Sequence, residues 1–307
     1  MIQTNAFEIL SKTGDPEIAE VYVAKFRGDS NLLAEFVEAR DPDVPKDEKW
    51  VIIVSTQFGC PVGCSMCDAG GDFRGNLTAD EIFGQIDYII GQNPLKRLFS
   101  VEKFKIQFAR MGEPTLNPAV LDVLRDIPKK YDASGLIPCI ATVAPTASRD
   151  WLENLLEIRC TEYMGRPFQL QLSINSTDEV SRDKLMPVSK IGFKDLSNFA
   201  QRFFEGGPRK VALNFALSEG NAIEPRIIAD NFDSKTCCVK ITPLNPTYRS
   251  RDMGLKTALP PDAPNEVDRL CNELQDLGFD VILSIGDTRE NQIGSNCGMA
   301  VMKMRES

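Results

Sequence analysis

Residues 50–69 read WVIIVSTQFGCPVGCSMCDA, and the expected fold follows from this stretch. Its first six residues, WVIIVS, are mostly apolar and β-branched, which favours a buried strand. The loop that follows carries Cys60, Cys64 and Cys67 in the spacing CxxxCxxC. Three cysteines this close together, directly after a buried strand, indicate a loop that wraps one inorganic group.

The number of cysteines points to the kind of group. Iron–sulfur clusters are held by cysteine thiolates, and a fully ligated four-iron cluster uses four of them. With three, a [4Fe–4S] cluster keeps one iron open, and an open iron can bind the amino and carboxylate groups of S-adenosylmethionine (SAM). One electron passed to SAM then gives methionine and a deoxyadenosyl radical. The spacing therefore predicts a radical SAM enzyme with Cys60, Cys64 and Cys67 as cluster ligands.

A structural zinc loop is the alternative. Zinc takes four ligands, usually as two CxxC pairs. The sequence has no second pair, because Cys237 and Cys238 are adjacent, and it has no histidine.

The strand at 50–55 opens a series of alternating strands and helices. Further strands are expected at 103–109, 137–143, 168–174, 210–217 and 237–242, with 279–285 as a candidate last strand. Helices are expected at 78–91, 118–128, 148–158, 178–185, 194–205, 223–230 and 264–277, the first with a capping box of Thr78 and Glu81. This alternation predicts an α/β fold, a partial (β/α)6 barrel with its active site at the carboxyl ends of the strands.

The remaining segments flank this barrel. Residues 18–40 read as a β-hairpin within an N-terminal extension of residues 1–45. The barrel is expected over residues 46–290. Residues 291–307 are expected to form a C-terminal loop that carries Cys297.

Composition narrows the function classes. The 307 residues have a net charge of −9, which disfavours binding to nucleic acid through phosphate contacts. The absence of histidine excludes histidine-based triads and HExxH zinc sites. No apolar run is long enough to span a bilayer, and the acidic start is unlike a signal peptide, so we expect a cytoplasmic protein without a membrane partner.

A second motif, RMGEPTLN, follows the second expected strand of the barrel. A Gly-Glu-Pro sequence at a strand end can turn Glu113 toward the amino group of SAM. A surface turn is the alternative, but the position downstream of the cysteine loop favours the SAM role.

With these motifs in place, the sequence resembles the RlmN/Cfr family, radical SAM methyltransferases of adenine in ribosomal RNA. The resemblance runs from about Glu20 to Met299. It rests on six segments in order: STQFGCPVGCSMCDAG, FRGNLTADEIFGQI, RMGEPTLNP, QLSINSTDEVSRDKLMPVSK, ITPLNP and IGSNCGM.

The resemblance implies roles for individual residues. Gly112 and Glu113 would contact SAM, and so would Ser173, Asn175 and Asn245, with Thr142 in a similar position after the third strand. Cys297 matches the cysteine that the family methylates by displacement from one SAM, before a radical made from a second SAM activates the methyl group. Glu35 aligns with a glutamate proposed as a proton acceptor. A passive thiol in a Gly-flanked loop is the alternative for Cys297.

Four features depart from the family pattern. Ile53 stands where the family has a cysteine that releases the product, so either Cys139, Cys160, Cys237 or Cys238 takes its role or release uses a different chemistry. Few residues precede Cys60, so the family's N-terminal RNA-binding domain is expected to be missing. The net charge is acidic, and Asn175 replaces a histidine.

These departures leave three hypotheses. The leading one is a methyl or methylene transferase that uses Cys297 on a small-molecule or nucleotide-like acceptor, with an electron donor such as flavodoxin or ferredoxin. The second is a divergent RNA adenine methyltransferase, with a basic face of Lys103, Lys105, Arg110, Arg166, Arg182, Lys184 and Lys190. The third is a non-catalytic binding module, which the intact motifs disfavour.

Overall fold

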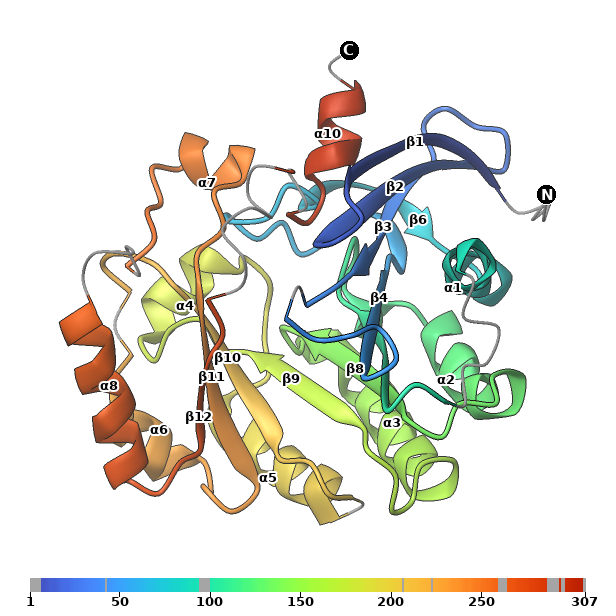
Figure 1. The fold of residues 1–307 in the computed structure, drawn as a ribbon. Coiled ribbons are helices and arrows are strands. Elements are labelled where there is room, and N and C mark those ends of the chain that lie inside the picture. The colour runs from blue at the N-terminus through green and yellow to red at the C-terminus, as the bar shows by residue number, and fades with distance from the viewer. Residues whose placement is uncertain are drawn as a thin grey trace.

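The computed structural model describes residues 7–41, 43–93, 100–205, 207–221, 223–258, 264–285, 293 and 296–305. Its main feature is one curved sheet with helices along its outer side (Figure 1). The strands follow the order β1 (Phe7–Asp15), β2 (Ala19–Phe26), β3 (Leu33–Ala39), β4 (Lys49–Val54), β7 (Lys103–Phe108), β8 (Leu136–Thr142), β9 (Gln169–Ser173), β10 (Val211–Leu217), β11 (Cys237–Pro243) and β12 (Val281–Leu283).

From β4 to β12 the neighbouring strands are parallel, as the alternation of strands and helices predicts. The helices between them are α1 (Ala79–Gln92), α2 (Ala119–Lys130), α3 (Arg149–Thr161), α4 (Glu179–Leu185), α5 (Phe193–Glu205), α6 (Pro225–Asn231), α7 (Tyr248–Asp252) and α8 (Pro264–Asp276). Among the described strands, β1 and β12 end the sheet and do not pair with each other. The partial barrel is confirmed, with the candidate last strand as a short β12.

Helix α1 shows why the local sequence folds as expected. The side chain of Thr78 accepts from the backbone N–H of Glu81, and the Glu81 side chain accepts from the backbone N–H of Thr78. This capping box satisfies N–H groups that a helix start leaves without partners. The apolar face of α1 then packs on the sheet through Ile82, Ile86 and Ile89, which are all fully buried.

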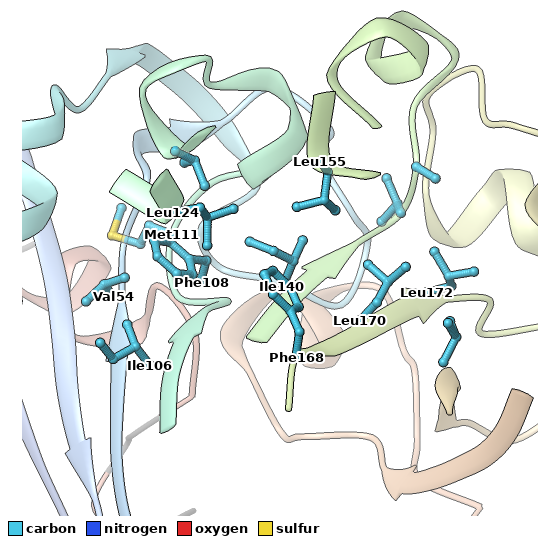
Figure 2. Packing of buried hydrophobic residues seen from close by; sticks show 14 of the residues in the cluster. Val54, Ile106, Phe108, Met111, Leu124, Ile140, Leu155, Phe168, Leu170 and Leu172 are labelled. Atoms are coloured by element: carbon cyan, nitrogen blue, oxygen red, sulfur yellow. The ribbon is translucent and has the colours of Figure 1, made fainter. Parts of the chain in front are cut away.

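The core lies between the sheet and its helices. Figure 2 shows Val54, Ile106, Phe108, Ile140, Leu170 and Leu172 of the strands packed with Leu124 of α2 and Leu155 of α3. These strand residues alternate with residues on the opposite, inner face of the sheet. The helices therefore cover the outer face of the sheet. The side chains at the alternate strand positions point to the inner face.

The N-terminal extension belongs to the same sheet. The expected hairpin is confirmed as β2 and β3, and β3 pairs with β4. Strand β1, which the sequence pattern does not predict, pairs antiparallel with β2. A helix near the C-terminus, α10 (Met299–Arg305), packs on β2 and β3, so the C-terminal segment lies against the N-terminal strands (Figure 1).

A second, two-stranded sheet is also absent from the sequence-based prediction. Strands β5 (Gln57–Cys60) and β6 (Gly71–Asn76) pair antiparallel and bracket the cysteine loop. Residues 286–292, 294, 295, 306 and 307 lie outside the described residues, so only part of the expected C-terminal loop is covered. No described helix has the length and apolarity needed to cross a bilayer.

Candidate active site

The cysteine loop leaves the end of β5 and returns through β6. Cys60 is buried, and Cys64 and Cys67 are half-buried. The three thiols lie close enough for their charges to act on one another, and burial raises the pKa of Cys60 to about 12. Backbone N–H groups of Val62 and Gly63 donate to the sulfur of Cys60, and the N–H of Ala69 donates to Cys67.

This donor set fits an iron–sulfur cluster. N–H donors around thiolate sulfurs stabilise their negative charge and tune a cluster. Adding a Cβ to Gly63 would meet no atom within 4 Å, so there is open space beside the loop. The described residues contain no group of three His, Cys, Asp or Glu that converges on one metal ion. A four-iron cluster needs no such convergence, because each of its cysteines binds a different iron.

The segment after β11 forms hydrogen bonds to the cysteine loop. The Asp68 carboxylate accepts from the backbone N–H groups of Tyr248 and Arg249 at 3.0 and 2.8 Å. Thr247 donates to the carbonyl of Met66, and the Arg249 guanidinium donates to the carbonyl of Gly70. Sequence reasoning missed Asp68 and Arg249, because nothing local in the sequence indicates that these two segments meet.

The Gly-Glu-Pro segment lies beside β5. The backbone N–H of Glu113 donates to Gln57 Oε1 at 2.8 Å. Gly112 has a φ of 104°, and a Cβ there would come within 2.7 Å of Thr56 Oγ1 and Gln57 Cβ. Only glycine fits this close approach in this backbone conformation.

The Glu113 carboxylate is buried and points toward the end of β8. It accepts from the N–H of Val143 at 3.0 Å and from the hydroxyl and N–H of Thr115 at 2.8 and 3.1 Å. Burial raises its pKa, although these hydrogen bonds oppose the shift. Thr142 lies in the same network, 3.3 Å from the Thr115 hydroxyl. A carboxylate has further lone pairs, so Glu113 can still accept a hydrogen bond from the amino group of SAM.

Cys297 lies against the cysteine loop. Its thiol donates to the sulfur of Cys67, which lowers the pKa of Cys67 and raises that of Cys297 well above its usual range. The thiol also contacts the carbonyl oxygen of Arg110. Gly298, with a φ of 87°, packs so tightly that a Cβ would be 2.1 Å from the backbone nitrogen of Ala69.

Glu35 anchors this segment from β3. Its side chain is fully buried and forms an ion pair with Arg110 Nη2 at 2.7 Å. Its carboxylate also accepts from the N–H of Gly298 at 2.5 Å and of Val301 at 2.9 Å. Arg110 in turn donates to the carbonyl of Asn296 at 3.1 Å. The two residues on either side of Cys297 are thus held by one buried ion pair.

Three further predicted SAM contacts lie at or after the carboxyl ends of β9 and β11. Asn175 has a φ of 60°, and its amide is engaged by Met186 Sδ and by the N–H of Ala216. Ser173 is half-buried at the end of β9, opposite Asn214 of β10. Asn245 is exposed after β11. The structure thus brings together Cys60, Cys64, Cys67, Glu113, Glu35 and Cys297, and the contact of the other three with SAM stays a prediction.

The four cysteines that could take the role of the family's release cysteine lie in different parts of the fold. Cys160 is exposed on α3, and Cys237 is buried against the helices. Cys139 and Cys238 alternate with core residues and therefore lie on the inner face of the sheet. The Cys139 sulfur accepts from Gln171 Nε2 at 2.9 Å.

The expected basic face does not form as a whole. Arg110 is buried in its pair with Glu35, and Arg182 is buried under the ring of Phe193. The ammonium of Lys190 is engaged by Asp183 and by two backbone carbonyls. These three residues were predicted wrongly as contributors to an RNA-binding surface, because their tertiary partners cannot be read from the sequence.

Comparison with known proteins supports the family resemblance. No protein-family model matches the chain. It is 28% identical over 201 residues to a probable dual-specificity RNA methyltransferase RlmN from Rhodopirellula baltica, covering 64% of this chain and 51% of that protein. It is 27% identical over 270 residues to the corresponding protein from Thermus thermophilus, covering 85% of this chain and 70% of that protein. The first of these matches spans about half the length of the relative.

Solved structures confirm the fold. A radical SAM methyltransferase from Sphaerobacter thermophilus superimposes with a TM-score of 0.73 at 19% identity, covering 96% of this chain and 81% of that one. SuiB from Streptococcus suis, bound to S-adenosylmethionine, superimposes with a TM-score of 0.51 at 14% identity, covering 76% of this chain and 50% of that one. The chain is therefore a distant relative of RlmN with the fold of the radical SAM methyltransferases.

Proposed function

We propose that this protein is a radical SAM methyltransferase in which Cys60, Cys64 and Cys67 hold a [4Fe–4S] cluster and Cys297 carries the methyl group. The observation that carries the proposal is the attachment of Cys297 to the cysteine loop. Gly298 packs on the backbone of Ala69, and the Cys297 thiol contacts Cys67. When bound, the cluster and SAM would supply the electron and the radical that activate the methyl group.

The chain's own residues would bind and orient the reactants. Glu113 would accept from the amino group of SAM, supported by its buried position beside β5 and β8. Gly112 would contact SAM, and its lack of a side chain allows the close packing on Thr56 and Gln57 beside Glu113. The Cys297 thiol would lose its proton to water, and its sulfur would form a bond to the methyl group as the sulfur–methyl bond of SAM breaks and S-adenosylhomocysteine leaves. An electron donor such as flavodoxin or ferredoxin would reduce the enzyme.

Glu35 and Arg110 would act as positioning residues for Cys297. Both carboxylate oxygens of Glu35 already accept hydrogen bonds from Arg110 or from backbone N–H groups around Cys297. A carboxylate held in this way fixes a backbone segment. The role of Glu35 as a proton acceptor stays a prediction.

For the acceptor we propose a small molecule or a nucleotide-like compound. The net charge of −9 and the burial of Arg110, Arg182 and Lys190 support this choice over a long polyanion. An RNA acceptor is the second candidate, favoured by the similarity to proteins named RNA methyltransferase RlmN. An RNA complex that weakens steeply with salt would favour the second candidate.

Product analysis under anaerobic conditions tests the proposal. Protein reconstituted with iron and sulfide is given SAM and a reductant, and deoxyadenosine and S-adenosylhomocysteine are quantified. We expect both products from the wild type and from Cys237→Ala, and no deoxyadenosine from Cys60→Ala, Cys64→Ala or Cys67→Ala. Neither product from a wild-type protein with a full cluster would contradict the enzymatic proposal.

A further inference from the structure

The inner face of the parallel sheet carries polar side chains among apolar ones. The interior of a closed (β/α) barrel is packed with branched apolar side chains. Here the residues that alternate with the core residues include Lys105 and Gln107 of β7, Gln171 of β9, Asn214 of β10 and Lys240 of β11. A face built from amides and lysines on four strands is suited to a polar molecule rather than to a dry core.

The charged side chains on the inner face of strands β4 and β7 to β12 are all positive. None of the inward-facing positions on strands β4 and β7 to β12, as far as the structure describes them, is Asp or Glu. Lys49 is neutralised by Asp41 at 2.8 Å, and Arg110 at the site end pairs with Glu35. Lys105 and Lys240 have no acidic partner among the described residues.

Lys240 is half-buried, and one neutral side chain contacts its ammonium. Its ammonium donates to Gln171 Oε1 at 3.3 Å, a long contact to a neutral oxygen. Burial lowers its pKa, and the positive charge of Lys105 lowers it further. A half-buried cation without a counter-ion is less favourable than a paired one, because no opposite charge offsets its partial loss of hydration. Such a group is a candidate for ligand binding, because a bound anion removes that cost.

A neutral polar group also lacks a partner here. Asn214 Oδ1 is buried and accepts no hydrogen bond from the described residues. In the register of the sheet Asn214 lies beside Ser173 and is paired with Lys240. An unsatisfied buried acceptor next to a lysine that lacks a counter-ion matches a ligand that offers both a donor and an anionic group.

We propose that the acceptor is a small molecule with a phosphate or carboxylate group, which binds to Lys105 and Lys240 on the inner face of the sheet while a donor group of the same molecule binds Asn214. This rests on the proposed function and names its substrate class. It places the negative charge of the substrate inside a protein whose net charge is negative.

The test is anion binding to the cluster-reconstituted protein, without SAM or reductant. Inorganic phosphate and acetate are titrated by calorimetry, and lysines are acetylated with limiting acetic anhydride and mapped by mass spectrometry. We expect at least one anion to reduce labelling of Lys105 and Lys240 about fivefold and to leave the exposed Lys235 unchanged. Binding of phosphate alone or acetate alone identifies the anionic group.

Anion binding by variants of Lys240 is the second measurement. Lys240→Met and Lys240→Gln should each weaken anion binding at least tenfold, and the matched control Lys235→Met should not change it. Two variants of different polarity separate a binding effect from a folding defect. The inference is overturned if neither anion binds, if Lys235 is protected equally, or if both Lys240 variants bind as the wild type does. Anion binding without deoxyadenosine formation would contradict only the proposed function.

Discussion

Glu35 and Glu38 lie three residues apart on β3, and both side chains are buried, yet they face opposite sides of the sheet. Glu38 accepts from Lys46, from Trp50 Nε1 at 3.0 Å and from Asn93 Nδ2 at 3.2 Å, all near the start of β4 and the end of α1. Glu35 accepts from Arg110 and from the backbone N–H groups of Gly298 and Val301, which follow Cys297. Burial of an acid therefore does not indicate function by itself, and its partners do.

The largest expected difference between the two acids concerns their cationic partners. Arg110→Met leaves the fully buried Glu35 without its counter-ion, which should lower the free energy of unfolding by about 3–5 kcal/mol. Lys46→Met should cost about 1–3 kcal/mol, because Glu38 keeps two side-chain donors. Urea denaturation of the two variants measures both values. Equal losses would mean that the Glu35 pair is not the more critical one.

Glu35 holds the backbone of Gly298, which packs against Ala69 of the cysteine loop. Gly298→Ala would force a Cβ onto the backbone of Ala69, so it should cost roughly 1–3 kcal/mol and displace Cys297 from the cysteine loop. Gly192→Ala is the matched control, because a Cβ there meets no atom within 4 Å. Denaturation and the rate of Cys297 alkylation by iodoacetamide, in cluster-loaded protein, check both effects. A Gly298→Ala protein with unchanged stability and alkylation would show that this contact does not hold Cys297.

The smallest effect separates the two acids most specifically. Glu35→Gln keeps the shape but weakens the charged hydrogen bonds to the backbone N–H groups of Gly298 and Val301, which hold the segment after Cys297, by about 1.5 kcal/mol. Alkylation of Cys297 should therefore become about tenfold faster, since about 1.36 kcal/mol corresponds to a factor of about ten. Glu38→Gln should leave this rate unchanged. Equal acceleration in both variants would indicate general loosening instead of a local anchor.

Much of the fold could be predicted because its signals are local. The apolar runs indicate the parallel strands, and Thr78 with Glu81 indicates the start of α1. Strand β1 was missed because it lies at the sheet edge and its residues alternate between half-buried and exposed. Strand β6, GDFRGN, was missed because two glycines and three polar residues carry no apolar pattern.

The candidate site also contains parts that the sequence indicates and parts that only the fold shows. The cysteine loop and the Gly-Glu-Pro segment are compact motifs, so their residues could be named from the sequence. The pair of Glu35 and Arg110 joins segments far apart in the chain, and only the fold reveals it. Arg110 was assigned to a basic surface, since an arginine in a loop is usually exposed.

The mass of the peptide that carries Cys297 shows whether this cysteine is the methyl carrier. Cluster-loaded protein is incubated with SAM that has a deuterated methyl group, and the peptide is then mapped. We expect a deuterated methyl group on Cys297 in the wild type and in Glu38→Gln, and a reduced amount in Glu35→Gln. An unmodified Cys297 in wild-type protein that still forms deoxyadenosine would contradict its role as the methyl carrier.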